Sequence, residues 1–382
     1  MNKYISIFFC VQIIALNLFA MQPKVTPVDY VRPQIDTHKS RWFFFSSASR
    51  PFGMVSLSPD TWTEGSWNSG YLYNSKEIRC FSHVHCWQLA GVPVMPTTGE
   101  VKGHKGMDAY KSTYSHETEI VKPGYHKVEL DTYQIRVELT STSRVGMHRY
   151  TYPAGEKANV LFDVGALLAH GKTEKAAIHR ISSKEIGGYS VLAPTSRRKK
   201  PVTVYFVARF NQNMTAFGGW EKEGKEKKLV HKNSIEGADI GGYASFGKLK
   251  KQTLLMKVGI SYVSEEQARI NLEKELAHWN FDRVKEDAFA EWNRELGKIT
   301  VEGGSEEEKI KFYTDLWHSL LGRHTFSDFN GKYIDNTGEE PVVRQVPLDN
   351  GTPTRNTYNS DAFWGSEFNL NILWSIAYPK VM

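Results

Sequence analysis

The chain has 382 residues, more than one hydrophobic core usually organises, so two packed units are expected. A hydrophobic fraction of 40% and a charged fraction of 24% are those of a globular protein and exclude a largely disordered or collagen-like chain. The net charge of +6, from 48 basic and 42 acidic residues, is too small for a chain of this size to indicate nucleic-acid binding. Aromatic residues make up 13%, and their ring faces suit stacking on sugars.

Residues 1–20 are typical of a signal peptide. Lys3 supplies the positive start, and an almost uninterrupted apolar run extends from Tyr4 to Ala20, after which we expect cleavage. This run is shorter than the roughly 20 residues of a membrane-spanning helix, and no second run of that length follows. A lipoprotein signal would place a cysteine just after the run, whereas Cys10 lies inside it. We therefore expect an exported protein, periplasmic or secreted, with no membrane span.

From about residue 50 to 263, short apolar stretches alternate with turn residues, which predicts an all-β domain. Apolar and polar residues alternate over 133–141, so one face of that strand is expected to meet a core. Further strands are predicted at 158–168, 202–210 and 254–262. So many short strands predict a two-sheet β-sandwich, which we place at residues 21–263.

Two smaller features of this region carry predictions of their own. The charge runs at 197–200 and 222–228 are predicted to be solvated hairpin tips. Cys80 and Cys86 are expected to be buried thiols, or a disulfide if a sharp turn brings them together.

Helical periodicity replaces the strand pattern after residue 263. Ser264 begins one predicted helix, a second is predicted from about Asp282 to Gly297, and a capping box of Ser305 and Glu308 opens a third. We interpret 264–303 as a helical linker and 304–382 as the beginning of a helical domain. The last stretch, 370–378, resembles a core helix, so we expect this domain to be incomplete.

Aromatic and histidine side chains concentrate between residues 60 and 87. Trp67, beside Tyr71, either packs on a sheet or provides a face on which a sugar stacks. His83 and His85 are two residues apart, so on a strand both imidazoles lie on one face. They are metal ligands, polar contacts for a bound ligand, or satisfied core histidines, and the lack of a visible third ligand disfavours the metal.

Carboxylates gather near the C-terminal end: Asp328, Asp335, Asp349, Asp361 and Glu367. Glycosidic bond cleavage uses two such groups, one as acid and one as base or nucleophile. Asp328 belongs to a predicted tight turn with Gly331, because the other ligands of a calcium loop are absent. Asp361 lies among aromatic residues, where burial perturbs a carboxyl group, and is therefore predicted to contact a ligand.

Short stretches with a fixed order run through most of the chain after the signal peptide. They are Pro51–Val55, Leu57–Asp60, Gly70–Tyr71, Phe81–His85, Met95–Pro96, Ser115–Glu117, Pro123–Tyr125, Glu138–Thr140, Arg144–Gly146, Phe312–Leu320, Phe326–Asp328, Asn330–Tyr333, Trp364 and Tyr378–Pro379. Together they resemble glycoside hydrolase family 92, the calcium-dependent exo-α-mannosidases that invert the anomeric centre.

The resemblance implies a mainly β plus α architecture: an N-terminal β-sandwich, a helical linker and the start of an (α/α)6 barrel. The sugar pocket is expected between the two domains. Mannose-containing glycans are the implied partners and calcium the implied cofactor. The implied sugar contacts are Trp67, Tyr71, His83, His85, Asp361 and Trp364. The acid, the base and the main calcium ligands are expected beyond residue 382, so no catalytic residue or metal ligand is assigned.

The sequence departs from the family pattern at two places. Gly365 follows Trp364 where the family has an aspartate that contacts the terminal mannose, and 37–49 replaces a segment rich in glycine and histidine. We therefore expect part of an exported glycosidase that removes terminal α-linked mannose by inversion, with this chain alone inactive. The alternatives are a glycosidase for another hexose and a non-catalytic carbohydrate-binding protein.

Overall fold

The computed structural model describes residues 25–38, 45–64, 70–86, 89–166, 168, 172–196, 198–360 and 369–382. Several predictions concern residues outside these ranges. They are the signal peptide at 1–20, Trp67, Asp361, Trp364 and Glu367.

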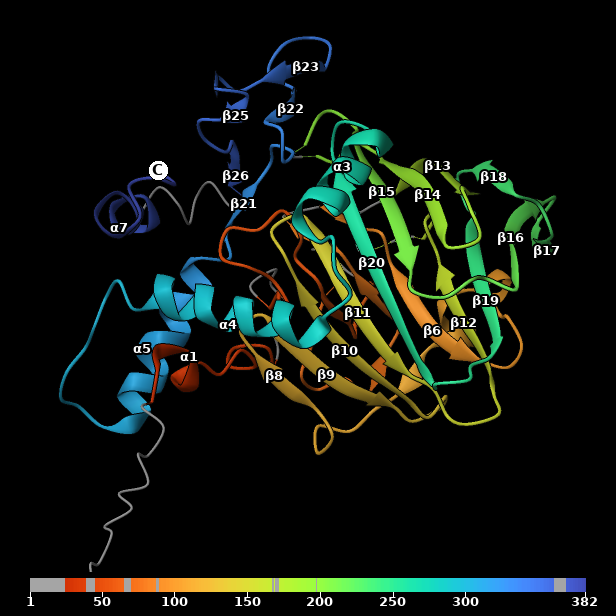
Figure 1. The fold of residues 1–382 in the computed structure, drawn as a ribbon, viewed down its shortest axis with the longest axis horizontal. Helices are drawn as coiled ribbons and strands as arrows, with labels where there is room; N and C mark the ends of the chain where they lie inside the picture. Colours follow the sequence, from red (N-terminus) through yellow and green to blue (C-terminus); the bar gives the residue numbers. More distant parts are fainter. Residues whose placement is uncertain are drawn as a thin grey trace, which may run out of the picture.

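Two antiparallel sheets form the body of the molecule (Figure 1). The first has the order β1-β3-β6-β12-β19-β16-β17, with bounds Ser58–Asp60, Cys80–Ser82, Val94–Thr98, Lys157–Phe162, Gly241–Lys248, Ala216–Glu223 and Glu226–Val230. The second has the order β18-β13-β14-β15-β20-β11-β10-β9-β8, with bounds Ser234–Gly237, Thr173–Arg180, Glu185–Leu192, Val202–Phe210, Thr253–Ser261, Val145–Thr151, Ile135–Ser141, Tyr125–Leu130 and Ile120–Lys122. The predicted sandwich is confirmed.

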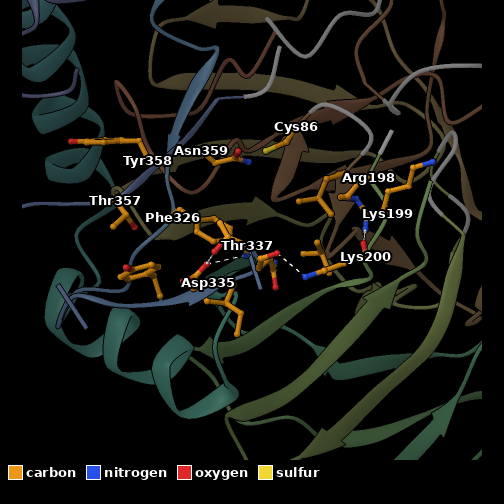
Figure 2. A pocket seen from close by; sticks show the side chains of 15 residues that line it. Cys86, Arg198, Lys199, Lys200, Phe326, Asp335, Thr337, Thr357, Tyr358 and Asn359 are labelled. Atoms are coloured by element: carbon orange, nitrogen blue, oxygen red, sulfur yellow. Dashed lines mark hydrogen bonds between the residues drawn. The ribbon is translucent and has the colours of Figure 1, made fainter. Parts of the chain in front are cut away.

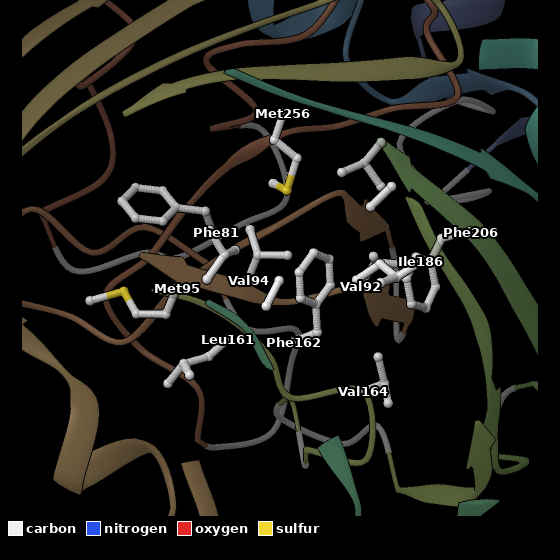
Figure 3. Close-up of a cluster of buried hydrophobic side chains, with 14 of the residues drawn as sticks. Phe81, Val92, Val94, Met95, Leu161, Phe162, Val164, Ile186, Phe206 and Met256 are labelled. Carbon is white, nitrogen blue, oxygen red and sulfur yellow. The ribbon is translucent and has the colours of Figure 1, made fainter. Parts of the chain in front are cut away.

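Apolar side chains from both sheets interdigitate in the main core (Figure 3). Phe162 of β12 stacks on Phe206 of β15, with ring centroids 5.9 Å apart, and so joins the two sheets. The strands predicted at 202–210 and 254–262 correspond to β15 and β20. The strand predicted at 158–168 is shorter, because the chain turns at Asp163, whose carbonyl accepts from the Ala166 amide at 3.0 Å.

The outer face of the nine-stranded sheet is covered as well. Helices α3 (Glu265–Glu275) and α4 (Phe281–Leu296) lie against it and share a buried apolar cluster with Val145, Met147 and Val207. This corrects the prediction for 133–141, which gave the strand one buried face. Glu138 and Thr140, on the other face of β10, are also buried, because α4 packs over them.

The predicted helix starts agree with the structure. Ser264 caps α3, and Ser305 forms a capping box with Glu308 at the start of α5 (Glu306–Ser319). Helix α1 (Pro27–Tyr30) packs on α4 and α5, and a second apolar cluster centres on Trp292, Trp317 and Trp374. None of the described helices is both long and apolar enough to span a membrane.

The described part of the segment after α5 contains short two-stranded sheets and helix α7. The pairs are β21 (Arg323–Thr325) with β26 (Tyr358–Ser360), β22 (Lys332–Asp335) with β23 (Val342–Gln345), and β24 (Leu348–Asp349) with β25 (Thr352–Pro353). Helix α7 (Asn371–Ala377) buries Trp374, but Ile372 is 61% and Ile376 78% exposed. The predicted core helix therefore buries only one face, and the (α/α)6 barrel and the domain bounds stay predictions.

Smaller elements cover the edges of the sandwich. They are the pair β2 (Glu77–Ile78) and β7 (Ser112–Thr113), the pair β4 (Val84–Cys86) and β5 (Leu89–Gly91), the 3-10 helix η1 (Gly103–Lys105) and helix α2 (Met107–Tyr110). Cys80 and Cys86 are buried free thiols, so no disulfide joins them. The run at 222–228 is a hairpin tip between β16 and β17, as predicted, with Gly224 in the left-handed region.

A buried arginine ties the sandwich to the linker and the C-terminal segment. Arg144 donates to Glu275 Oε1 at 2.7 Å, to the Ser327 carbonyl at 2.7 Å and to Asn356 Oδ1 at 2.8 Å. Nearby, Asp328 accepts from Ser261 at 2.9 Å. These contacts join the sandwich, the linker helices and the C-terminal segment.

Candidate functional site

A cavity of about 570 Å³ lies where the sandwich meets the C-terminal segment (Figure 2). Its volume is within the range of small-molecule sites. The β4–β5 hairpin contributes Cys86 and Leu89, and the connection from β14 to β15 contributes residues 198–200. The segment after α5 closes the other side with Phe326, Tyr333, residues 334–337 and residues 357–359.

The basic side of the cavity is built into the fold. Arg198 donates to the carbonyls of Ala193 at 2.7 Å and Lys200 at 2.5 Å, and burial lowers its pKa. Lys200 donates across the junction to the carbonyls of Asn336, at 2.8 Å, and Gly338. The prediction of a solvated hairpin tip is therefore wrong for Arg198, because the half-buried guanidinium holds its own loop together.

Opposite these groups lie an acidic side chain and aromatic rings. Asp335 accepts from the Thr337 hydroxyl at 2.6 Å and from Arg344 Nε at 2.5 Å, and these contacts lower its pKa to about 2. It is therefore ionised at neutral pH and can accept from a ligand hydroxyl, but it holds no proton to donate. Phe326, Tyr333 and Tyr358 supply apolar surface. Among the described lining residues Asp335 is the one carboxylate, so they contain no acid–base pair.

The predicted contacts His83 and His85 lie inside the core. The Nε2 of His83 lies 2.8 Å from His148 Nε2, its Nδ1 lies 2.7 Å from the Val92 carbonyl, and burial lowers its pKa to about 4. Both ring nitrogens of His85 also have partners, the Ser56 carbonyl at 2.6 Å and Asp60 at 2.8 Å. His83 is 0% and His85 2% exposed. This corrects the prediction of sugar contact for both, because these are satisfied core histidines.

Tyr71 is also buried, at 1% exposure, within a polar cluster that the sequence did not reveal. Its hydroxyl donates to Glu119 Oε2 at 2.9 Å, and His116 Nδ1 lies 2.6 Å from the same oxygen. His126 Nε2 lies 3.1 Å from Glu119 Oε1, an ion-pair distance without hydrogen-bond geometry. Burial alone would raise the pKa of Glu119, but the partners, His126 foremost, outweigh it and lower that pKa.

Stacking fixes the ring of Tyr71. Its centroid lies 3.9 Å from that of Phe45, and the two rings are nearly parallel. The prediction of direct sugar contact is therefore corrected for Tyr71 as well, since both its ring and its hydroxyl are occupied by protein groups. The Ser-His-Glu stretch that begins at Ser115 signalled this region, but the convergence of Glu119 with His126 requires the folded sheet.

Asp328 and Asp349 are the two further predicted carboxylates within the described residues. Asp328 forms the predicted turn, in which the Gly331 amide donates to its carbonyl at 2.8 Å. Its side chain is 1% exposed, and burial raises its pKa to about 6. Asp349 is exposed on β24. Asp361 and Trp364, outside the described residues, follow the cavity-lining Asn359 in the sequence.

Comparison with known protein families identifies both the sandwich and the segment after it as parts of a glycoside hydrolase. Residues 30–261 match the glycosyl hydrolase family 92 N-terminal domain and residues 267–382 match the family 92 catalytic domain. The chain belongs to glycosyl hydrolase family 92.

Solved structures and a curated relative agree with this assignment. A family 92 α-mannosidase from Bacteroides thetaiotaomicron superposes with a TM-score of 0.79 at 27% identity, covering 92% of this chain and 47% of that one. An inverting family 92 mannosidase from the same organism has a TM-score of 0.77 at 22% identity, covering 93% of this chain and 46% of that one, and supports the fold. An uncharacterized secreted glycosidase from Arthroderma benhamiae is 23% identical over 78% of this chain and 40% of its own length. The chain therefore spans less than half the length of these relatives.

Proposed function

We propose that this chain is the N-terminal part of an exported exo-α-mannosidase that removes terminal α-linked mannose from glycans by inverting hydrolysis. The observation that carries the proposal is the family match, which runs through both the sandwich and the segment after it. The B. thetaiotaomicron α-mannosidase at 27% identity has also been solved with mannoimidazole, which supports mannose as the sugar.

The cavity at the junction is the proposed place of the sugar. Trp67, Asp361 and Trp364 remain the proposed sugar contacts. Among the described residues, Asp335 and the aromatic rings of the cavity offer a hydroxyl acceptor and apolar surface. His83 and His85 do not contact the sugar in this proposal. They lie in the core and support the strands that form the sandwich side of the cavity.

Inverting hydrolysis needs two carboxyl groups roughly 6.5 to 9.5 Å apart, one protonated and one ionised. The described lining residues offer only Asp335, whose low pKa prevents it from acting as the acid. We therefore propose that the 382-residue chain does not hydrolyse mannosides unaided. The acid and the base remain assigned to sequence beyond it.

The described residues do not fit calcium. Asp335 is the one carboxylate among the described residues that line the cavity, whereas calcium takes roughly six to eight oxygen ligands. The one group of metal-ligating side chains in the described part is Asp36, Asp315 and His318, on the surface at α5, and it includes an imidazole where calcium prefers oxygen. No step of the reaction is therefore derived through calcium.

A glycosidase for another hexose is the second candidate, favoured by Gly365 in place of the family aspartate. Both candidates are tested by expressing the longest product of the coding frame and following cleavage of α-mannosides, α-glucosides and α-galactosides by proton NMR. We expect mannose release, and none from the 382-residue chain. Cleavage of another hexoside with mannosides untouched would favour the second candidate, and turnover by the 382-residue chain would show that its catalytic groups lie within it.

A further inference from the structure

A second cavity is lined by residues of β13 and β17 and by residues that follow β12 and β18. Strands β17 and β18 lie at the opposite end of the sandwich from β21 to β26 (Figure 1). The volume of the cavity is about 380 Å³, also within the range of small-molecule sites. Polar side chains from four parts of the chain line it: Asp163, Lys172 with Thr173, Lys227 and Asp239. None of these residues takes part in the site proposed for hydrolysis.

One carboxylate oxygen of Asp163 is an acceptor that lacks a donor among the described residues. Its side chain is 4% exposed, and its Oδ2 accepts from the Tyr110 hydroxyl at 2.7 Å. The other oxygen, Oδ1, is buried without a hydrogen-bond partner among the described residues. Burial raises the pKa of this carboxyl to about 6, so it is mainly ionised at neutral pH. An unpaired buried acceptor costs about 1–3 kcal/mol, which a donor from a ligand would recover.

An ion pair supplies the complementary groups. Lys227 Nζ lies 2.5 Å from Asp239 Oδ1, and the two side chains are 24% and 42% exposed. The ammonium has three donors, of which this contact uses one. The cavity therefore presents a buried acceptor beside a partly exposed donor and a second acceptor. Met107, half-buried, adds apolar surface to the lining.

A lining of carboxylates and ammonium groups suits a ligand that carries hydroxyls better than a ligand that carries a net charge. A hydroxyl both donates and accepts, so neighbouring hydroxyls can bond a carboxylate and an ammonium together. The carboxylates of Asp163 and Asp239 repel an anion, and the ammonium groups of Lys172 and Lys227 repel a divalent cation. We propose that this cavity binds a neutral monosaccharide, with Asp163 accepting from one hydroxyl and Lys227 donating to the next.

The test uses the 382-residue chain and ligand-observed NMR titrations with D-mannose and D-glucose. We expect one of these sugars to bind with a dissociation constant on the order of 1 mM. Lys227→Met should weaken binding roughly 10- to 100-fold, the effect of losing a charged hydrogen bond. Asp163→Asn should weaken binding as well, because the amide offers a donor in place of one acceptor.

Two controls separate this site from the hydrolytic one. Lys227 is partly exposed, so Lys227→Met keeps the fold even if Asp163→Asn disturbs the contact with Tyr110. Lys200→Met removes an ammonium from the other cavity and should leave the titration unchanged. The proposal is overturned if neither sugar binds at about 50 mM, well above that expected constant. It is also overturned if Lys227→Met binds as the wild type does, or if binding is lost in Lys200→Met alone. These titrations measure binding alone, so their outcome does not depend on whether the protein has mannosidase activity.

Discussion

Arg144→Met should loosen the C-terminal segment from the sandwich. The Arg144 and Glu275 side chains are only 7% and 8% exposed, so the substitution leaves a buried carboxylate without its cation. It also removes donors from the Ser327 carbonyl and from Asn356. Breaking one partner of a buried pair costs about 3–5 kcal/mol, a large share of a domain's stability. We expect that loss in the free energy of unfolding from urea titration, with faster hydrogen exchange over 323–360.

Arg136→Met is the matched control on the neighbouring strand β10. Arg136 also pairs with a glutamate, Glu129, but is 51% exposed, so its removal should cost less than about 1 kcal/mol. If Arg144→Met were no more destabilising than this control, or left exchange over 323–360 unchanged, Arg144 would not hold the junction together.

Three further predictions concern other parts of the chain. Burial raises the pKa of Asp328 from 3.8 to about 6, so the native state binds its proton more tightly than the unfolded chain does. Its contribution to stability is therefore complete below pH 3.8 and falls by about 3 kcal/mol as the pH rises to about 6. This pH dependence should be missing from Asp328→Asn in paired urea titrations, and its persistence would refute the assignment. Trp67→Ala in the full-length protein should weaken mannoside binding by about 1–3 kcal/mol in calorimetry, and unchanged affinity with an intact fold would make Trp67 a packing residue. The intact mass of exported protein should correspond to cleavage after Ala20, and retention of Met1 would exclude the signal peptide.

Local patterns in the sequence predicted local structure well. The capping residues Ser264 and Ser305 mark helix starts because a hydroxyl satisfies free amides at a helix N-terminus. The apolar stretches at 202–210 and 254–262 identified β15 and β20, but they could not show that α3 and α4 cover the outer face of the sheet. Whether these helices pack on the sheet depends on the path of the linker after β20, and a short stretch of sequence does not contain that information.

The site was harder to predict because it depends on distant contacts. The family resemblance implied a sugar contact for His83, whereas its Nε2 lies against His148, on another strand. The unpaired oxygen of Asp163 likewise has no local signal, since its isolation results from the packing of α2 and β12. Residue type indicated which side chains can bind or react with a ligand. The fold is needed to show which of these side chains a ligand can reach.

The central claim is that the protein acts on terminal α-linked mannose with inversion. The measurement is the proton NMR time course of an α-linked mannobiose with the longest product of the coding frame, observed before the released sugar mutarotates. We expect β-mannose to appear first and α-mannose to follow by mutarotation. Initial release of α-mannose would contradict inversion, and an intact mannobiose beside cleavage of another α-hexoside would contradict the proposed substrate.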